Sequence, residues 1–90
     1  MKFEWDPGKA VANERKHGIT FDEASTVFGD DLSVSGRDLD NSVGENRFVT
    51  FGLSSQGYVL VVSHTDRAGV IRIISARPAT RKEKQLYEEG

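Results

Sequence analysis

The sequence contains no cysteine and no long uninterrupted run of apolar residues. The first absence excludes a disulfide framework and a thiolate metal site, and it fits a reducing compartment. The second matters because a membrane-spanning helix needs roughly 20 apolar residues and a signal peptide needs an apolar core. The stretch from Met1 to Asp6 contains no such core. We therefore expect a cytoplasmic protein without a membrane segment.

Positive charge is also in short supply. Lysine and arginine number 12 against 14 aspartates and glutamates, which gives a formal net charge of −2. A protein that coats nucleic acid through bulk electrostatics carries a basic excess, so this composition argues against one. Any contact with nucleic acid must use a local basic site. With 90 residues, 37% of them hydrophobic, the chain has room for one core.

A short strand and a helix are predicted at the N-terminus. The strand spans residues 3–5. Asp6 suits the N-cap position of a helix, and Pro7 suits the first helical position. The helix is expected to run to His17 and to end at Gly18, because glycine adopts the left-handed conformation that closes many helices.

A second helix is predicted to start at Thr20. Thr20 and Glu23 have the spacing of a capping box, in which each side chain binds the backbone amide of the other residue. Gly29 ends the element. The residues spaced to face the core are Phe21, Ala24, Val27 and Phe28.

The second half of the chain predicts a sheet. Residues 30–45 are polar and acidic, and we expect a short strand and a mobile loop there. Apolar runs at 47–53, 58–65 and 70–77, separated by turns at 54–57 and 66–69, predict an antiparallel meander. Residues 58–62 are apolar on both faces, which indicates the central strand.

A third helix closes the predicted fold. Pro78 ends the last strand, and Thr80 with Glu83 repeats the capping-box spacing. Leu86 and Tyr87 are expected to anchor this helix. The fold class is therefore α+β, with a small antiparallel sheet flanked by helices in the order β-α-α-β-β-β-β-α.

The residues that could carry chemistry are basic and protic. Neither histidine sits in a metal-ligand pattern, so we assign no metal site. No nucleophile elbow and no glycine-rich phosphate loop is present. RNA supplies its own nucleophile, the 2′-hydroxyl, so a ribonuclease can work with a base, an acid and cations around the phosphate. The groups suited to phosphate are Lys9, Lys16, His17, Arg47, His64, Arg67, Arg72, Arg77, Arg81 and Lys82.

One face of the first helix concentrates several of these groups. Lys9, Asn13, Lys16 and His17 lie close together at the helical period, and this face could contact RNA. The alternative is a solvated face, on which Lys16 and His17 only complement the helix dipole. Asn13 could equally cap a neighbouring backbone group.

Two arginines in the last strand present a problem of direction. In a regular strand Arg77 shares a face with Ile71 and Ile73, while Arg72 points the opposite way. Both can enter one site only if the strand twists or bulges. Arg77 is the stronger candidate, and Arg72 could instead be an outward cation or pair with a carboxylate such as Glu83.

Two further side chains have structural interpretations. His64 lies at a strand end next to a turn, where a surface histidine is expected. Trp5 could stack on an RNA base, but a core anchor against the first helix is the favoured interpretation.

In combination, these residues resemble the BrnT toxins of bacterial toxin–antitoxin pairs, over essentially the whole chain. Each fragment is weak alone, but Lys-His-Gly after an early Trp-Asp, with Arg-Ile-Ile-Ser-Ala-Arg near the end, is specific together. The matching positions in the first half are Phe3, Trp5-Asp6, Lys9-Ala10, Asn13, Lys16-His17-Gly18, Phe21, Ala24, Val27-Phe28 and Asp30. Those in the second half are Glu45, Arg47, Gly52, Leu60-Val61-Val62, Thr65, Arg67, Ile71 to Ala79, Glu83 and Tyr87.

The resemblance implies one toxin domain over residues 1–90, with a RelE-like fold and an activity that cleaves RNA without a metal. It also implies a cognate antitoxin of the BrnA type, which neutralises the toxin. That antitoxin carries a ribbon-helix-helix region, through which the complex binds promoter DNA.

The resemblance also suggests site residues. We assign His17 as acid or base, and Arg47 and Arg77 as groups that stabilise charge on the phosphorane. Five further cations are assigned to substrate binding: Lys9, Lys16, Arg67, Arg72 and Arg81. One departure is that RelE-like ribonucleases are usually basic, whereas this chain is slightly acidic.

Two other functions compete with this one. A non-catalytic interaction module would use the same cations only to dock an acidic partner. A direct DNA-binding regulator is least favoured, because no helix-turn-helix recognition helix with exposed basic residues is apparent.

Overall fold

The computed structural model describes residues 1–38 and 46–89. Its elements follow the predicted order, with a 3-10 turn after the second helix. Residues 39–45, part of the predicted loop, lie outside the described residues. The elements are β1 (Lys2–Glu4), α1 (Pro7–His17), α2 (Phe21–Thr26), η1 (Val27–Gly29), β2 (Val34–Arg37), β3 (Arg47–Leu53), β4 (Val59–Arg67), β5 (Val70–Pro78) and α3 (Arg81–Glu89).

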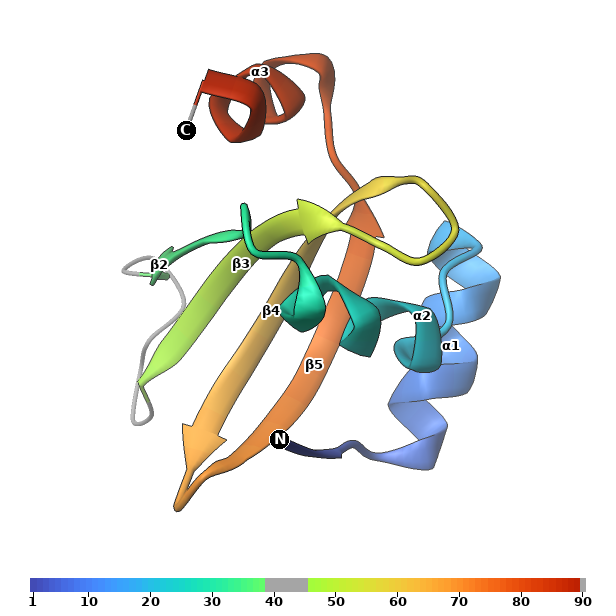
Figure 1. The fold of residues 1–90 in the computed structure, drawn as a ribbon. Coiled ribbons are helices and arrows are strands. Elements are labelled where there is room, and N and C mark those ends of the chain that lie inside the picture. The colour runs from blue at the N-terminus through green and yellow to red at the C-terminus, as the bar shows by residue number, and fades with distance from the viewer. Residues whose placement is uncertain (39–45, 90) are drawn as a thin grey trace.

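The strands form one sheet in the order β1-β5-β4-β3-β2 (Figure 1). Strands β2 to β5 pair antiparallel, as the predicted meander requires, and β4 is the central strand as predicted. β1 pairs in parallel with β5, so the sheet is mixed. The sequence did not predict this parallel pair, because three residues at the N-terminus carry no signal for a partner.

The helices begin and end where the capping signals predict. Asp6 caps α1, with its Oδ2 accepting a bond from the Lys9 amide at 2.9 Å. Gly18 closes α1 with a φ of 72° and donates its amide to the Glu14 carbonyl at 2.8 Å. These ends depend on contacts between neighbours in the chain, which explains why sequence predicts them well.

The second helix differs in one detail from its predicted capping box. Thr20 accepts the Glu23 amide at 3.0 Å, as expected. The Glu23 carboxylate does not return to Thr20 but accepts a hydrogen bond from the Ser54 hydroxyl at 2.7 Å. This contact ties α2 to the turn between β3 and β4.

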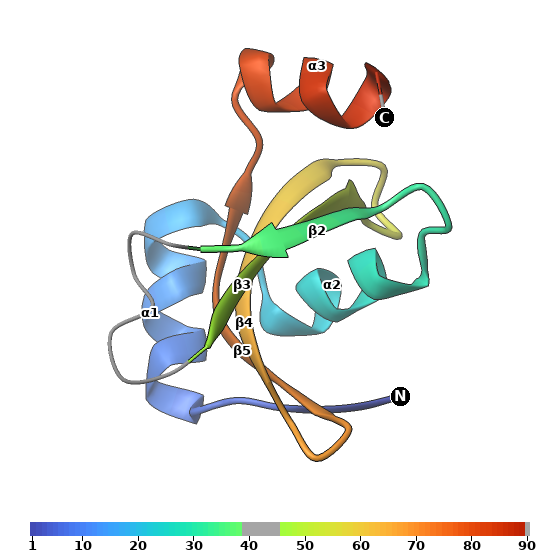
Figure 2. The ribbon, with the colours of Figure 1, turned by 90° about the vertical axis from the view of Figure 1, so that its left-hand side faces the viewer.

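The core lies between α2 and one face of the sheet. α1 and α2 lie on opposite sides of the strands, with α1 along β5 (Figure 2). Trp5 packs against the core as predicted, and its ring meets Phe21 of α2, the second helix, edge-on at 5.9 Å between centroids. The buried residues of the core are Ile19, Phe21, Ala24, Val27, Leu60, Val62, Ile73 and Ala76.

Gly52 lies where β3 and η1 approach closely. A Cβ atom there would lie 2.6 Å from Val27 Cγ1 and 3.2 Å from the Val27 carbonyl oxygen. We expect Gly52→Ala to lower the free energy of unfolding by roughly 1–3 kcal/mol, because this core has no room for the methyl group. Urea unfolding measures the loss. The matched control is Gly36→Ala on β2, where a Cβ meets nothing within 4 Å, and equal losses in both variants would refute the packing argument.

The hairpin between β4 and β5 is tighter than predicted. Residues 66–69 were expected to form the turn, but Asp66 and Arg67 belong to β4. The turn consists of Ala68 and Gly69, with φ of 51° and 83°. Two consecutive residues with positive φ form the type of tight turn whose twist matches that of the strands.

Candidate functional site

A β-bulge in β5 determines which way the side chains of this strand point. The register between β4 and β5 shifts between Ser63 and His64, which leaves Ile74 as an extra residue on β5. Burial confirms the shift, since Ile73 and Ala76 are both buried in the core at 1% and 0% exposure. Residues three apart face the same side of a strand only when a bulge intervenes.

The bulge places Arg72 and Arg77 on the same face of the sheet, away from the core. A regular strand would place Arg77 beside Ile71 and Ile73 and opposite Arg72, so the bulge meets the condition under which the sequence allowed both arginines to share a site. Ile71 and Ile73 pack into the core instead. The bulge removes the obstacle to a site that uses both arginines.

A third arginine faces the same way. Arg47 of β3 pairs with Thr65 of β4, and Thr65 pairs with Arg72 of β5, so the three residues form a row across the sheet. Thr65 is 3% exposed, and its hydroxyl has no hydrogen-bond partner among the described residues. We call the surface formed by Arg47, Ser63, Arg72, Ser75 and Arg77 the arginine face.

Two serines lie between the arginines on this face. Ser63 and Ser75 pair across β4 and β5, two rows from the pair of Val61 and Arg77, so both pairs lie on the same face. Both serines are half-buried. Because their side chains are small, they form a low, hydroxyl-lined floor with cations on either side.

An open hollow of about 240 Å³ adjoins the arginine face at β5. α1 contributes Lys9, Lys16 and His17 to its lining, and β5 contributes Ile74 and Ser75. The prediction that these cations share one face of the helix is confirmed. Since Ser75 belongs to both surfaces, the cations of α1 and the arginines of the sheet border one continuous region.

Asn13 has a structural role: it binds neighbouring backbone groups, which was the alternative to a contact with RNA. Its side chain is 7% exposed. Its Nδ2 donates to the carbonyls of Ile19 at 2.9 Å and Ala76 at 2.8 Å, and its Oδ1 accepts the Ala76 amide at 3.0 Å. These bonds fix α1 against β5 and thereby position the hollow.

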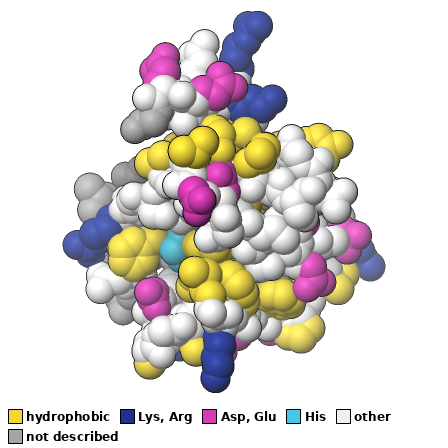
Figure 3. Space-filling model, viewed as in Figure 1, with side chains coloured by type: hydrophobic (Ala, Val, Ile, Leu, Met, Phe, Trp, Pro, Cys, Tyr) yellow, Lys and Arg dark blue, Asp and Glu magenta, His cyan; other side chains and the backbone are white. Residues whose placement is uncertain are grey.

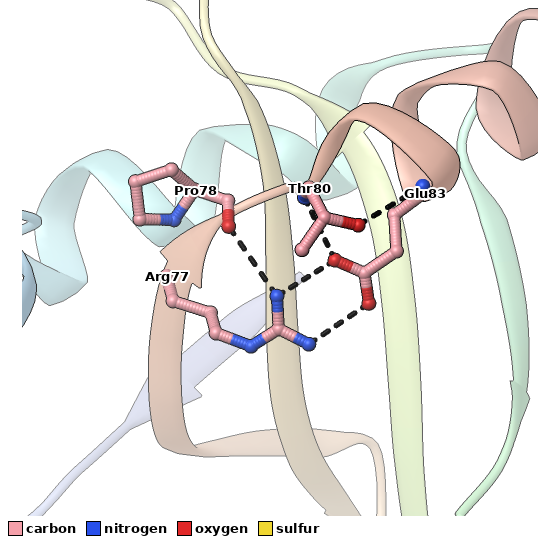
Figure 4. A network of polar contacts seen from close by, with 4 residues as sticks. All are labelled: Arg77, Pro78, Thr80 and Glu83. Carbon is pink, nitrogen blue, oxygen red and sulfur yellow. Dashed lines mark hydrogen bonds and ion pairs between the residues drawn. The ribbon is translucent and has the colours of Figure 1, made fainter.

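Arg77 is held by α3. Its Nη1 and Nη2 donate to the two carboxylate oxygens of Glu83 at 2.7 and 2.8 Å, and Nη1 also contacts the Pro78 carbonyl at 3.3 Å (Figure 4). The guanidinium lowers the pKa of Glu83 to about 2, and the carboxylate raises the pKa of Arg77. The pair is therefore ionised throughout the physiological range.

The carboxylate partner of Arg72 is Glu4, not Glu83, which the sequence suggested as one alternative. Its Nη1 lies 3.6 Å from Glu4 Oε1 of β1, whereas Glu83 binds Arg77. The Arg72 side chain is 36% exposed. An exposed pair at this distance contributes little to stability, so Arg72 can exchange this partner for another anion.

The last two predicted substrate-binding arginines lie at ends of elements. Arg67 is exposed at the end of β4, two residues beyond Thr65. Arg81 is exposed at the first residue of α3 and lines neither the hollow nor the arginine face. The structure therefore extends the cationic surface towards Arg67 but does not bring Arg81 into it.

His64 is buried, and the prediction of a surface histidine is wrong. It is 6% exposed, and its Nε2 lies 2.7 Å from the Thr50 hydroxyl, which lies 2.7 Å from the Ser35 hydroxyl. Its ring meets Phe28 edge-on and stacks on Phe48. Because Leu60 and Val62 face the core, the alternation of β4 was the signal that could have placed His64 there too.

The burial of His64 makes stability depend on pH. Desolvation lowers its pKa from the ordinary 6.5, although Asp66 opposes this shift. The unfolded chain then binds a proton more readily, so stability is complete above pH 6.5 and falls as the pH drops below it, by up to about 1.4 kcal/mol per pH unit. We expect urea midpoints to fall between pH 7.5 and 5, and to fall less for His64→Gln. Identical pH dependence in both proteins would exclude His64 as the source.

Sequence reasoning missed an anchor of α3. Asp30 accepts hydrogen bonds from the amides of Leu32 and Leu53 at 3.0 and 2.8 Å, and from the hydroxyl of Tyr87 at 2.5 Å. These bonds lower the pKa of Asp30. Tyr87 thus anchors the helix as predicted, but Leu86 is 53% exposed and does not.

Among the residues that the structure describes, the side of the molecule that carries α2 shows no comparable cationic patch (Figure 3). Lysine and arginine side chains visible from this side lie at its margins, around hydrophobic, uncharged and acidic surface (Figure 3). Within residues 1–38 and 46–89, no group of three histidine, cysteine or acidic side chains could hold a metal ion. No helix in the same part of the chain has the length and apolar character to cross a membrane.

Comparisons with known proteins identify the class of protein. Residues 5–83 match the family model described as the ribonuclease toxin BrnT of type II toxin–antitoxin systems. The fold is similar to the 1.1 Å crystal structure of the Brucella abortus ribonuclease toxin BrnT, with a TM-score of 0.70 and 20% identity. That alignment covers 90% of this chain and 99% of the Brucella chain. No curated protein sequence matches.

The match places this chain among the toxins of type II toxin–antitoxin systems. It belongs to the BrnT family of ribonuclease toxins. The resemblance in the sequence and the predicted α+β fold are thereby confirmed.

Proposed function

We propose that this chain is an endoribonuclease toxin of the cytoplasm that cleaves RNA without a metal, as a single domain over residues 1–90. The observation that carries the proposal is the bulge in β5. It brings Arg72 and Arg77 to the face that holds Arg47, beside the hollow that contains His17. Convergent arginines suit the dispersed charge of a phosphate in its transition state.

In the proposed reaction the substrate supplies the nucleophile. The 2′-oxygen attacks the adjacent phosphorus and loses its proton, while the bond from phosphorus to the 5′-oxygen breaks and that oxygen gains a proton. His17 serves as the acid or the base in these proton transfers. Arg47 and Arg77 stabilise the negative charge on the phosphorane. Lys9, Lys16, Arg67, Arg72 and Arg81 bind neighbouring phosphates.

The net charge of −2 is compatible with this proposal. Acidic side chains away from the site need not repel RNA, because salt screens exposed charges over roughly 8 Å at physiological ionic strength. The local excess of cations on the arginine face and α1 acts within that distance.

We further propose a BrnA-type antitoxin as the partner that neutralises the toxin. Membership in a type II toxin family supports an antitoxin partner and an RNA target. The ribbon-helix-helix region of this antitoxin would bind promoter DNA, and the toxin would reach DNA only within the complex. Co-purification with the antitoxin followed by DNA binding of the complex, but not of the toxin alone, is the test.

The activity is tested with the purified chain, free of any partner, on total RNA in EDTA. We expect cleavage by the wild-type protein and about a hundredfold slower cleavage by Arg77→Ala, which removes one stabiliser of the transition state. Circular dichroism confirms that both proteins fold. If a folded wild-type chain leaves RNA intact with and without Mg²⁺, the interaction-module hypothesis replaces this proposal. Cleavage only with Mg²⁺ would refute metal independence alone.

A further inference from the structure

The contact between Arg77 and Glu83 uses only part of the guanidinium. Glu83 takes one N–H from each terminal nitrogen, and the Pro78 carbonyl takes a second contact from Nη1. The Nε–H and the other N–H of Nη2 lie on a different edge of the planar group. These two donors have no partner among the described residues, and the side chain is 41% exposed.

Glu83 is itself held in place by the first turn of α3. Its Oε1 accepts the Thr80 amide at 2.9 Å, and its own amide donates to the Thr80 hydroxyl at 3.2 Å. This is the reciprocal capping box that the sequence predicts. This box is local to the first turn and does not depend on the bond between Tyr87 and Asp30 near the other end of α3. The carboxylate is therefore a fixed point to which Arg77 is docked.

We propose that Glu83 is a positioning residue for Arg77, which holds one edge of the guanidinium so that the Nε–Nη2 edge presents two parallel donors to a phosphate of RNA. Bidentate contacts of this kind bind phosphate with defined geometry. The inference rests on the proposed function, because it takes Arg77 to contact the reacting phosphate and to stabilise its charge in the transition state.

The geometry indicates that Glu83 positions Arg77 and does not compete with phosphate for it. A carboxylate that blocked both edges would have to leave before a phosphate could bind. Glu83 occupies the edge between the terminal nitrogens, and the Nε–Nη2 edge takes no bond from Glu83 (Figure 4). A guanidinium without this contact would sample many rotamers, and it would lose orientation that it now has before substrate arrives.

The first test compares cleavage by Glu83→Gln and Tyr87→Phe. The glutamine side chain in the first variant keeps an oxygen for the Thr80 amide but loses the charge and the second acceptor for Arg77. We expect its kcat to fall about tenfold while KM changes less than threefold, because Arg77 acts in the transition state. Tyr87→Phe loosens the other end of α3 and should cleave like the wild type. Glu83→Asp, which is too short for both bonds, should resemble Glu83→Gln and serves if that variant folds poorly.

The second test does not depend on cleavage. NMR follows the Nε–H signal of Arg77 during titration with inorganic phosphate. The signal is assigned by its absence in Arg77→Lys. We expect this signal to shift in the wild type and in Tyr87→Phe, and to require at least threefold more phosphate in Glu83→Gln. If the wild type does not cleave RNA but this pattern is seen, positioning stands and the proposed activity fails. Faster or unchanged cleavage by Glu83→Gln, or an unchanged phosphate response, overturns the positioning role.

Discussion

Replacing Asn13 with alanine is expected to lower the free energy of unfolding by roughly 3–5 kcal/mol. The substitution leaves the Ile19 carbonyl and both polar backbone groups of Ala76 without the partners they have now. β1 pairs only with Val70 to Arg72 of β5. Beyond that point, the Asn13 side chain binds the edge of β5 in place of a strand.

Thermal and urea unfolding of Asn13→Ala measure this loss. A loss of this size is a large part of the stability of a small domain, so the melting temperature should fall by more than 10 °C, at about 4–8 °C per kcal/mol. The control is Asn46→Ala. Asn46 is exposed, and among the described residues its side chain accepts a hydrogen bond only from Arg37 Nη2, at 2.8 Å. A loss below about 1 kcal/mol in Asn13→Ala would mean that water replaces the amide at the strand edge.

The caps and the order of elements could be predicted because they depend on neighbours in the chain. Asp6, Gly18 and Thr20 each act within four residues of their own position. The reciprocal box of Thr80 and Glu83 is equally local. A capping pattern in a sequence therefore predicts where a helix begins or ends, because the rest of the fold rarely disrupts these local hydrogen bonds.

The orientation of the candidate site could not be predicted, because it depends on a single extra residue. Nothing near Ile74 in the sequence marks a bulge, yet the bulge reverses the direction of Arg77 relative to Arg72. The partners of the two arginines are also set by tertiary structure. Glu4 meets Arg72 only because β1 pairs in parallel with β5, and that pairing joins segments far apart in the chain.

His64 was misplaced for a similar reason. Its position next to a predicted turn suggested the surface, but β4 continues to Arg67 and the turn is two residues long. The hydroxyl of Thr50 then satisfies one ring nitrogen inside the sheet. A polar residue in a strand is buried when a cross-strand neighbour supplies its hydrogen bond, and that neighbour is known only once the register is known.

The substitution His17→Gln is expected to slow RNA cleavage about a thousandfold, within the range lost when a general acid or base is removed. His17 lines the hollow beside Ser75 and is half-buried at the last residue of α1. Glutamine keeps a polar group of similar reach but cannot exchange a proton near neutral pH. The pH–rate profile should lose one of its limbs in the variant, while the rate of Lys16→Gln, which removes a neighbouring cation, should fall only about tenfold with its profile unchanged.

The same comparison separates chemistry from electrostatics at the end of α1. Arg15, Lys16 and His17 all lie in the last turn, where positive charge complements the helix dipole. If His17 served only that purpose, His17→Gln would change stability by less than about 1 kcal/mol and leave cleavage as it is. Cleavage at the wild-type rate with an intact pH profile would therefore assign His17 to the helix alone, and the acid and base would have to be sought elsewhere on the arginine face.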